Sequence, residues 1–276
     1  MADDCGLLNL ATCLPQKLFD FFLGIFNAPL QPLLSFTKTL LTSPIDLGLF
    51  ASLWGIMIYI ISLFYGLLLL YSGFNFMISG YDVVKREKAK EWLRNIFIMI
   101  VLVQASYFIY GLILDINSLL TIGIINLIDN DFFLLSADNI VNIGLQFLFA
   151  IFYVLALLMA VIILMIRYVV VAVGVVFVPL AIFLYFIPPL KEYGKLIMNY
   201  LGVCIFLTFF DAVILLACSK LIDVGIFDNF KILVMITAFS IVNLLMGYLM
   251  VFTLVKSAMK SSGDFKIVKE VVKYIA

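Results

Sequence analysis

The stretch from Tyr71 to Asn95, YSGFNFMISGYDVVKREKAKEWLRN, concentrates charge between two long uncharged segments. Thirty-five residues without a formal charge separate Asp46 from Asp82, and a second uncharged run extends from Asn95 to Leu114. A helix of about 20 apolar residues crosses the hydrocarbon core of a bilayer. The charged stretch therefore predicts a hairpin that joins two membrane-spanning helices and stays on one side of the membrane.

The composition agrees with a membrane protein. Of the 276 residues, 66% are hydrophobic and 12% are charged, whereas soluble domains are roughly 45–50% apolar and about 25% charged. We expect an all-α polytopic protein with one transmembrane domain. The net charge of zero excludes a global basic field for nucleic acid. MADDCGLLNL has two acids where a signal peptide is basic, so no cleavable signal is expected.

Histidine is absent from the chain. This removes the commonest general base and the commonest metal ligand. The sequence also shows no phosphate-binding loop, no catalytic pair of carboxylates and no nucleophile next to a base. We therefore expect a protein that is not an enzyme and that needs no cofactor or metal.

Four cysteines fall into two pairs. Cys204 and Cys218 lie on one predicted helix, about 21 Å apart, so they cannot bridge each other. Cys5 and Cys13 are candidates for a disulfide if the N-terminus faces an oxidising compartment. Free thiols at these two positions are the alternative.

The first 46 residues are apolar but contain Pro15, Pro29, Pro32 and Pro44. Proline inside a helix removes a backbone hydrogen bond, so this pattern predicts one or two short helices instead of a continuous one. We expect residues 1–46 to lie flat on the outer membrane surface as an extracytoplasmic interfacial segment.

The transmembrane domain is expected over residues 47–256, followed by a cytoplasmic amphipathic tail over residues 257–276. The thirteen mostly apolar residues between Asp115 and Asp129 are too few to cross, which predicts an interfacial helix there, on the side of the membrane away from the basic hairpin. The predicted spans are Leu47–Ser79, Ile96–Leu114, Ile140–Ile166, Leu196–Ser219 and Ile232–Val255.

Tyr168–Leu190 decides the topology. It is long enough to cross, but Gly174 and Pro179 interrupt it and Pro188 and Pro189 stop it. If it crosses, Lys and Arg divide eight inside to nine outside; if it enters and returns, they divide thirteen to four. Cytoplasmic loops are enriched in Lys and Arg, so the second arrangement is favoured. It has five crossings and one re-entrant or broken helix, with the N-terminus outside and the C-terminus inside the cell.

Irregular backbone at membrane depth is tolerated only where it is buried in protein or lines water. Gly174 and Pro179 are therefore candidates for a transport pathway, and a purely structural break is the alternative. Asp211 lies near the middle of a span, where a charge costs at least about 2.5–3.5 kcal/mol. We expect it to act in gating or to form a structural pair or a subunit contact, with Arg167 as the candidate cationic partner; a protonated Asp211 that is merely tolerated also stays open.

The basic hairpin carries five cations that could contact an acidic or phosphate-bearing cytoplasmic partner. A basic cytoplasmic loop is also the ordinary signal of topology and needs no further function. The five cations are Lys85, Arg86, Lys88, Lys90 and Arg94.

Two stretches within residues 70–195 resemble a known family. YSGFNFMISGYDVVKREKAKEWLRNIFI is similar to the first cytoplasmic hairpin of TrbL-type inner-membrane subunits of type IV secretion and conjugation systems. RYVVVAVGVVFVPLAIFLYFIPPLKEYGK is similar to the segment of that family where an arginine-terminated span leads to a mid-membrane proline and a closing proline. Archaeal DNA-import proteins of the CedA kind share this plan.

The resemblance implies a channel or assembly platform that moves DNA or pilus subunits across the cytoplasmic membrane. It implies as partners a cytoplasmic ATPase, pilin subunits, further copies of the chain and DNA in transit, in addition to the lipid bilayer. A secondary transporter or channel for a small solute, built on a broken helix and Asp211, is the second hypothesis, although the sequence shows no internal repeat. A structural scaffold is the third.

Overall fold

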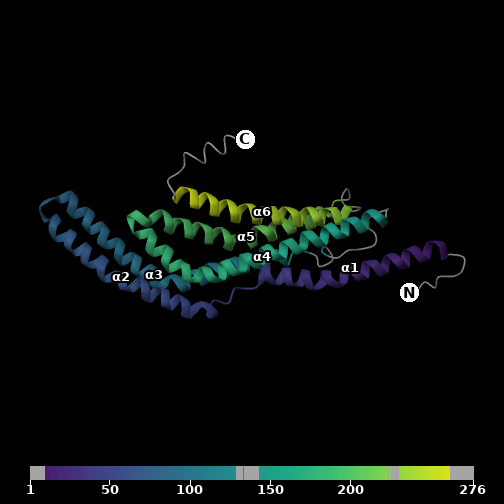
Figure 1. Cartoon of the computed structure of the whole chain (residues 1–276), viewed down its shortest axis with the longest axis horizontal. Coiled ribbons are helices and arrows are strands. Elements are labelled where there is room, and N and C mark those ends of the chain that lie inside the picture. The colour runs from purple at the N-terminus through teal and green to yellow at the C-terminus, as the bar shows by residue number, and fades with distance from the viewer. Residues whose placement is uncertain (1–9, 129–132, 134–142, 223, 225–229, 262–276) are drawn as a thin grey trace, which may run out of the picture. The chain divides into compact units, whose positions relative to one another are not determined.

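The structure is a computed structural model and describes residues 10–128, 133, 143–222, 224 and 230–261. These residues form long helices and contain no strand (Figure 1). The α-helices are α1 (Leu10–Thr42), α2 (Ala51–Ile78), α3 (Val83–Ile125), α4 (Ile143–Phe186), α5 (Lys191–Ile222) and α6 (Lys231–Ser261), and the short 3-10 helices are η1 (Leu47–Phe50), η2 (Ser79–Tyr81) and η5 (Pro188–Leu190). The all-α prediction is confirmed.

Among the described residues, five helical segments are long and apolar enough to cross a membrane, which is the predicted number of crossings. They are Leu47–Ile78, Val83–Ile125, Leu148–Phe186, Pro188–Ile222 and Lys231–Lys256. The chain divides into two compact units, and α3, α4, α5 and α6 each contribute residues to both. Unit 1 comprises Met1–Ser43, Ser118–Ile166 and Thr208–Gly247, and unit 2 comprises Pro44–Asn117, Arg167–Leu207 and Tyr248–Ala276.

The core of unit 2 forms where α2, α3 and α4 meet. Its buried side chains are Ile61, Ile96, Met99, Val103, Ile182 and Phe183. Trp54 on α2 donates a hydrogen bond from Nε1 to Ser106 Oγ on α3 at 3.0 Å, and its ring centroid lies 5.3 Å from that of Tyr107. These contacts hold α2 against α3 well away from the charged hairpin that connects the two helices.

Unit 1 has an aromatic core and a few specific polar contacts. The ring centroids of Tyr153 on α4 and Phe239 on α6 lie 5.8 Å apart, and both side chains are fully buried. Asn243 Nδ2 donates to the Ala156 carbonyl at 2.8 Å, which ties α6 to α4. Tyr153 Oη donates to the Phe133 carbonyl at 3.0 Å, and both bonds matter because leaving a polar group unpaired in a low-dielectric interior is costly.

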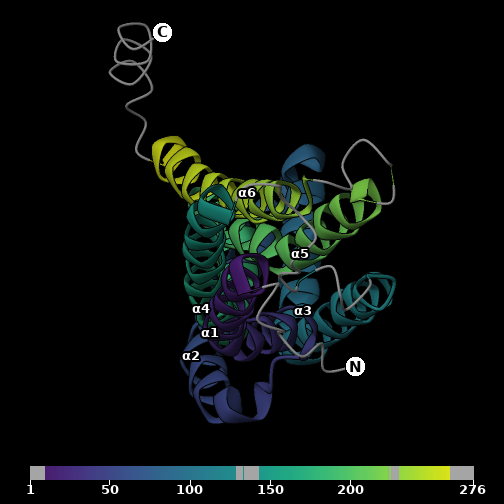
Figure 2. The ribbon, with the colours of Figure 1, turned by 90° about the vertical axis from the view of Figure 1, so that its right-hand side faces the viewer.

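The N-terminal segment differs from its prediction. α1 is one continuous helix of 33 residues that passes through Pro29 and Pro32. A proline in a helix costs about 3 kcal/mol, but burial of Leu30, Leu40 and Leu41 holds α1 in the bundle of unit 1, so packing overrides local propensity. α1 lies next to α4 in both views (Figures 1 and 2). Its location at the membrane surface stays a prediction.

The predicted re-entrant segment is also wrong. Residues after Arg167 continue the helix that begins at Ile143, and α4 runs unbroken for 44 residues with Pro179 inside it. Proline and glycine are tolerated in membrane helices when neighbouring helices hold the backbone in place. The chain turns only at η5, after which α5 runs back along α4, and a Cβ on Gly194 would collide with the backbone of Tyr185.

The region after Asp115 corrects a third expectation. α3 continues to Ile125 instead of ending at Leu114, so the interfacial helix predicted after Asp115 is the last part of α3. Ser118 Oγ donates to the carbonyl of Thr42 at 2.7 Å, which joins this last part of α3 to α1. Asp115 itself is exposed, so it does not interrupt the helix.

Candidate functional site

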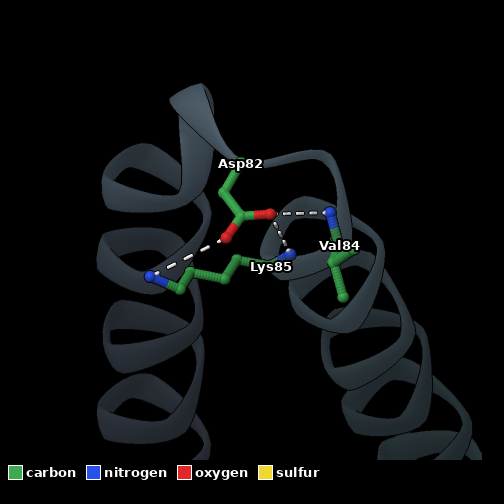
Figure 3. A network of polar contacts seen from close by, with 3 residues as sticks. All are labelled: Asp82, Val84 and Lys85. Atoms are coloured by element: carbon green, nitrogen blue, oxygen red, sulfur yellow. Dashed lines mark hydrogen bonds and ion pairs between the residues drawn. The ribbon is translucent and has the colours of Figure 1, made fainter.

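The basic hairpin is organised by Asp82, the N-cap residue of α3. Its Oδ1 accepts hydrogen bonds from the backbone N–H groups of Val84 at 3.0 Å and Lys85 at 3.4 Å (Figure 3). An acidic N-cap satisfies N–H groups that have no partner within the helix and opposes the positive end of the helix dipole. The Lys85 ammonium lies 3.8 Å from Asp82 Oδ2, so the same carboxylate also forms an exposed ion pair with the first lysine.

The five cations of the hairpin are all exposed: Lys85, Arg86, Lys88, Lys90 and Arg94. Within the described residues they form two ion pairs, Lys85 with Asp82 at 3.8 Å and Lys90 with Glu87 at 3.1 Å. Exposed ion pairs contribute at most about 1 kcal/mol. The positive charge of the hairpin is therefore available to a ligand or a partner, as the sequence suggested; the partner itself stays a prediction.

Arg167 occupies a different environment. The sequence predicts that Arg167 follows the end of a span, but the residue lies inside α4 with 4% of its surface exposed. Its Nε donates to the Cys204 carbonyl at 2.7 Å and its Nη2 donates to the Ile205 carbonyl at 3.1 Å, both on α5. An arginine cannot lose its charge in a protein, so these charge-assisted hydrogen bonds hold a permanent cation between α4 and α5.

Gly174 lies seven residues, or about two turns, further along α4, where α3 and α5 approach. Tyr110 Oη on α3 donates to the Val171 carbonyl at 2.6 Å. A Cβ built on Gly174 would lie 2.5 Å from Tyr110 Oη and 2.7 Å from Leu201 Cδ2. Gly174 is therefore a close-packing position within a continuous helix instead of a helix break.

Pro179 lies in the same part of α4, between the buried residues Val175 and Ala181. It has no N–H to donate to the Val175 carbonyl, so α4 lacks one hydrogen bond at this point. Arg167, Gly174 and Pro179 thus follow one another along α4 in unit 2. Their role in a pathway stays a prediction.

Asp211 is completely buried in α5, as are its neighbours Thr208 and Ala212. It belongs to unit 1, whereas Arg167 belongs to unit 2. The predicted pairing of these two side chains therefore stays a prediction. The depth of Asp211 in the protein agrees with the requirement that a carboxylate in an apolar span faces other protein groups.

Two of the four cysteines are described with their side chains. Cys204 and Cys218 are buried free thiols. Cys5 lies outside the described residues, and so does the side chain of Cys13, so the candidate disulfide stays a prediction. Of the predicted tail over residues 257–276, the first five residues belong to α6, and residues 262–276 lie outside the described residues.

Sequence reasoning missed Tyr110. A tyrosine in the middle of an apolar span was the available signal, because a buried hydroxyl needs an acceptor. The acceptor, the Val171 carbonyl, lies 61 positions away in the chain and could not be identified locally. The acceptors of Arg167 could not be identified locally either, because both lie on the next helix.

The fold and these sites define a polytopic all-α membrane protein with an exposed basic hairpin and a cation buried between two spanning helices. More specifically, the chain belongs to the family of TrbL/VirB6 plasmid conjugal transfer like proteins, whose family model matches residues 26–274. It is therefore a multi-pass membrane subunit of a conjugal transfer or type IV secretion system. No curated protein and no solved structure shows significant similarity to the chain.

Proposed function

We propose that this subunit forms a channel or assembly platform that moves DNA or pilus subunits across the cytoplasmic membrane. The observation that carries the proposal is the family match over residues 26–274 on a chain with five potential spanning helices. A buried cation supports it further, since charges kept at membrane depth mark pathways or conserved packing contacts. The chain contributes no enzymatic step: the machinery's ATPase supplies the energy.

The proposed orientation places the N-terminus outside and the C-terminus inside. An odd number of crossings puts the basic hairpin, the α4–α5 turn and the lysine tail on the same side, which is the side where Lys and Arg accumulate. In this orientation the hairpin faces a cytoplasmic ATPase. Further copies of the chain and pilin subunits are the other proposed partners.

Cysteine labelling tests the orientation. With Cys5 and Cys13 replaced, Val224→Cys after α5 should react with a membrane-impermeant maleimide in intact cells, because Val224 is exposed and the proposed orientation puts it on the outer side. Lys88→Cys in the hairpin should react only after the cells are opened. Labelling of Lys88→Cys in intact cells together with protection of Val224→Cys would invert the topology.

Asp211 distinguishes the proposal from the second hypothesis, a small-solute carrier. That hypothesis is retained because Asp211 is a completely buried carboxylate on a spanning helix. Asp211→Asn in the transfer subunit should lower the frequency of DNA transfer and the recovery of the assembled complex. Asp115→Asn makes the same chemical change at an exposed position of α3 and should leave both unchanged.

Solute uptake is the discriminating measurement. If Asp211→Asn abolishes proton-coupled solute uptake into vesicles while DNA transfer is retained, the carrier hypothesis is correct. If neither property changes, the chain is a scaffold and Asp211 has no part in transport.

A further inference from the structure

A cavity of about 330 Å³ lies at the base of the hairpin, between the end of α2 and the start of α3. Lys85 and Lys88 supply its positive charge, Tyr71 and Trp92 supply aromatic walls, and Asn75 adds a polar group. The ring centroids of Tyr71 and Trp92 lie 6.3 Å apart in an edge-to-face arrangement. The cavity thus combines cations, rings and hydrogen-bonding groups within unit 2.

The first turns of α3 have two distinct faces. Lys85, Lys88 and Trp92 are spaced by three and four residues, which places them on one face of a helix. The opposite face carries Glu87, Lys90, Glu91 and Arg94, which line a second cavity; Lys88, at the edge between the two faces, also lines it. The face toward α2 therefore carries two lysines and one acid within ion-pair distance, Asp82, whereas Glu87 and Glu91 match Lys90 and Arg94 in number on the opposite face.

Two groups on this face lack partners in the part of the chain that the structure describes. Lys88 forms no ion pair there, and Lys85 has only Asp82, at 3.8 Å. The indole Nε1 of Trp92 is buried and has no hydrogen-bond acceptor among the described residues. The Trp92 ring lines the cavity, while its N–H group is enclosed by the protein, so the lysines are the groups left for a ligand. Figure 3 shows the Lys85 side chain extending across the hairpin toward the other helix.

The surroundings of the cavity are those of a membrane interface. α2 ends here with Phe74, Met77 and Ile78 exposed, so apolar surface adjoins the charged cavity directly. Tyrosine and tryptophan are enriched at the level of the lipid headgroups, and clusters of Lys and Arg next to a span attract anionic lipids. A soluble phosphate would make no use of the adjoining apolar surface.

We propose that this cavity binds the headgroup of an anionic phospholipid of the surrounding bilayer. The ammonium groups of Lys85 and Lys88 contact the phosphate, the rings of Tyr71 and Trp92 form the walls around the headgroup, and the acyl chains run along the exposed apolar side chains of α2. The lipid then fills the base of the hairpin and leaves the opposite face, with Lys90 and Arg94, to a protein partner. This site is independent of the cargo and of the direction of transport.

Tryptophan fluorescence provides the test, because the chain contains only Trp54 and Trp92. A Trp54→Phe variant, reconstituted into vesicles, reports on Trp92 alone. Brominated phosphatidylglycerol should quench its fluorescence with a relative binding constant at least about fivefold above that of brominated phosphatidylcholine. The pair Lys85→Gln and Lys88→Gln should bring this ratio to about one.

The control pair Lys90→Gln and Arg94→Gln removes the same net charge from the opposite face and should keep the preference. Equal loss with both pairs would show diffuse surface charge instead of a site and would overturn the proposal. Suppression of the preference by inorganic phosphate, but not by chloride of equal ionic strength, would assign the cavity to soluble phosphates and would also overturn it. Native mass spectrometry checks the result on the protein with Trp54 intact. A phosphatidylglycerol adduct should be retained, and it should be lost with the Lys85 and Lys88 substitutions but not with the control pair.

Discussion

The basic hairpin and Arg167 both present positive charge, but their environments differ in every respect. The hairpin cations are exposed and their ion pairs lie on the surface. Arg167 is buried and its two described hydrogen bonds go to backbone carbonyls of α5. The comparison teaches that charge in a membrane protein has two separable uses. Exposed cations set orientation and recruit partners, whereas a buried cation joins helices.

The largest effect is expected for Arg167→Gln. Hydrogen bonds to charged groups contribute about 1.5–3 kcal/mol each, so the loss of two should lower the free energy of unfolding by about 3 kcal/mol or more. Arg94→Gln removes the same charge at an exposed site and should change it by less than about 0.5 kcal/mol. Unfolding in detergent followed by circular dichroism measures both. If both substitutions lower the free energy of unfolding equally, Arg167 stabilises the fold no more than an exposed cation of the hairpin does.

Gly174→Ala should have the next largest effect. The new methyl group would lie 2.5 Å from Tyr110 Oη and 2.7 Å from Leu201 Cδ2, and overpacking costs about 1–3 kcal/mol. Gly66→Ala in α2 meets nothing within 4 Å and should be neutral or stabilising, because alanine favours a helix over glycine by about 0.5–1 kcal/mol. The difference between the two unfolding temperatures is the measurement.

A double substitution sharpens this result. Tyr110→Phe removes the hydroxyl that a methyl group at position 174 would meet first. The pair Tyr110→Phe and Gly174→Ala should therefore be less destabilised than the sum of the single changes. Strict additivity would mean that Leu201 alone limits the space at Gly174.

Asp82→Ala should have a smaller effect, confined to the hairpin. Removing an acidic N-cap costs about 1 kcal/mol, and the N–H groups of Val84 and Lys85 would lose their acceptor. Hydrogen exchange should accelerate in the first turn of α3 and stay unchanged around Arg167. Asp82→Asn keeps an oxygen acceptor at the same position, so it should restore most of the protection.

The smallest effect is expected for Lys90→Gln. Its ion pair with Glu87 is exposed on both sides, and exposed pairs contribute about 0.2–1 kcal/mol or nothing measurable. The shift in unfolding temperature caused by Lys90→Gln should be no larger than the shift caused by Lys88→Gln, which breaks no described ion pair. A larger shift would indicate that the hairpin depends on its surface network for stability.

Sequence reasoning could predict the class of fold and the hairpin because both rest on local patterns. The uncharged runs on either side of Asp82 define two spans, and the charges between them define the turn. The continuity of α4 through Pro179 could not be predicted, since it depends on neighbouring helices that restrain the backbone. α1 gives the same lesson, because burial of Leu30 and Leu41 outweighs the prolines.

The candidate site was predictable only in its residue types. A lone arginine in an apolar region predicts a partner, but the Cys204 and Ile205 carbonyls are backbone groups that any sequence supplies. Gly174 was correctly selected as unusual, yet its reason is the proximity of Tyr110 and Leu201 instead of a break in the helix. The local sequence indicates that a residue is unusual, but only the packing around it explains why.

α2 has few buried residues, and this has a consequence for its sequence and its stability. Of its 28 residues only Ile61 and Ser72 are buried, so most of its side chains find their neighbours outside their own chain. Apolar residues on α2 should exchange for one another with little penalty over evolutionary time, whereas α4 and α5 should tolerate few replacements. Extraction from the bilayer should likewise disturb α2 first, and the choice of detergent will decide how much of this helix survives purification.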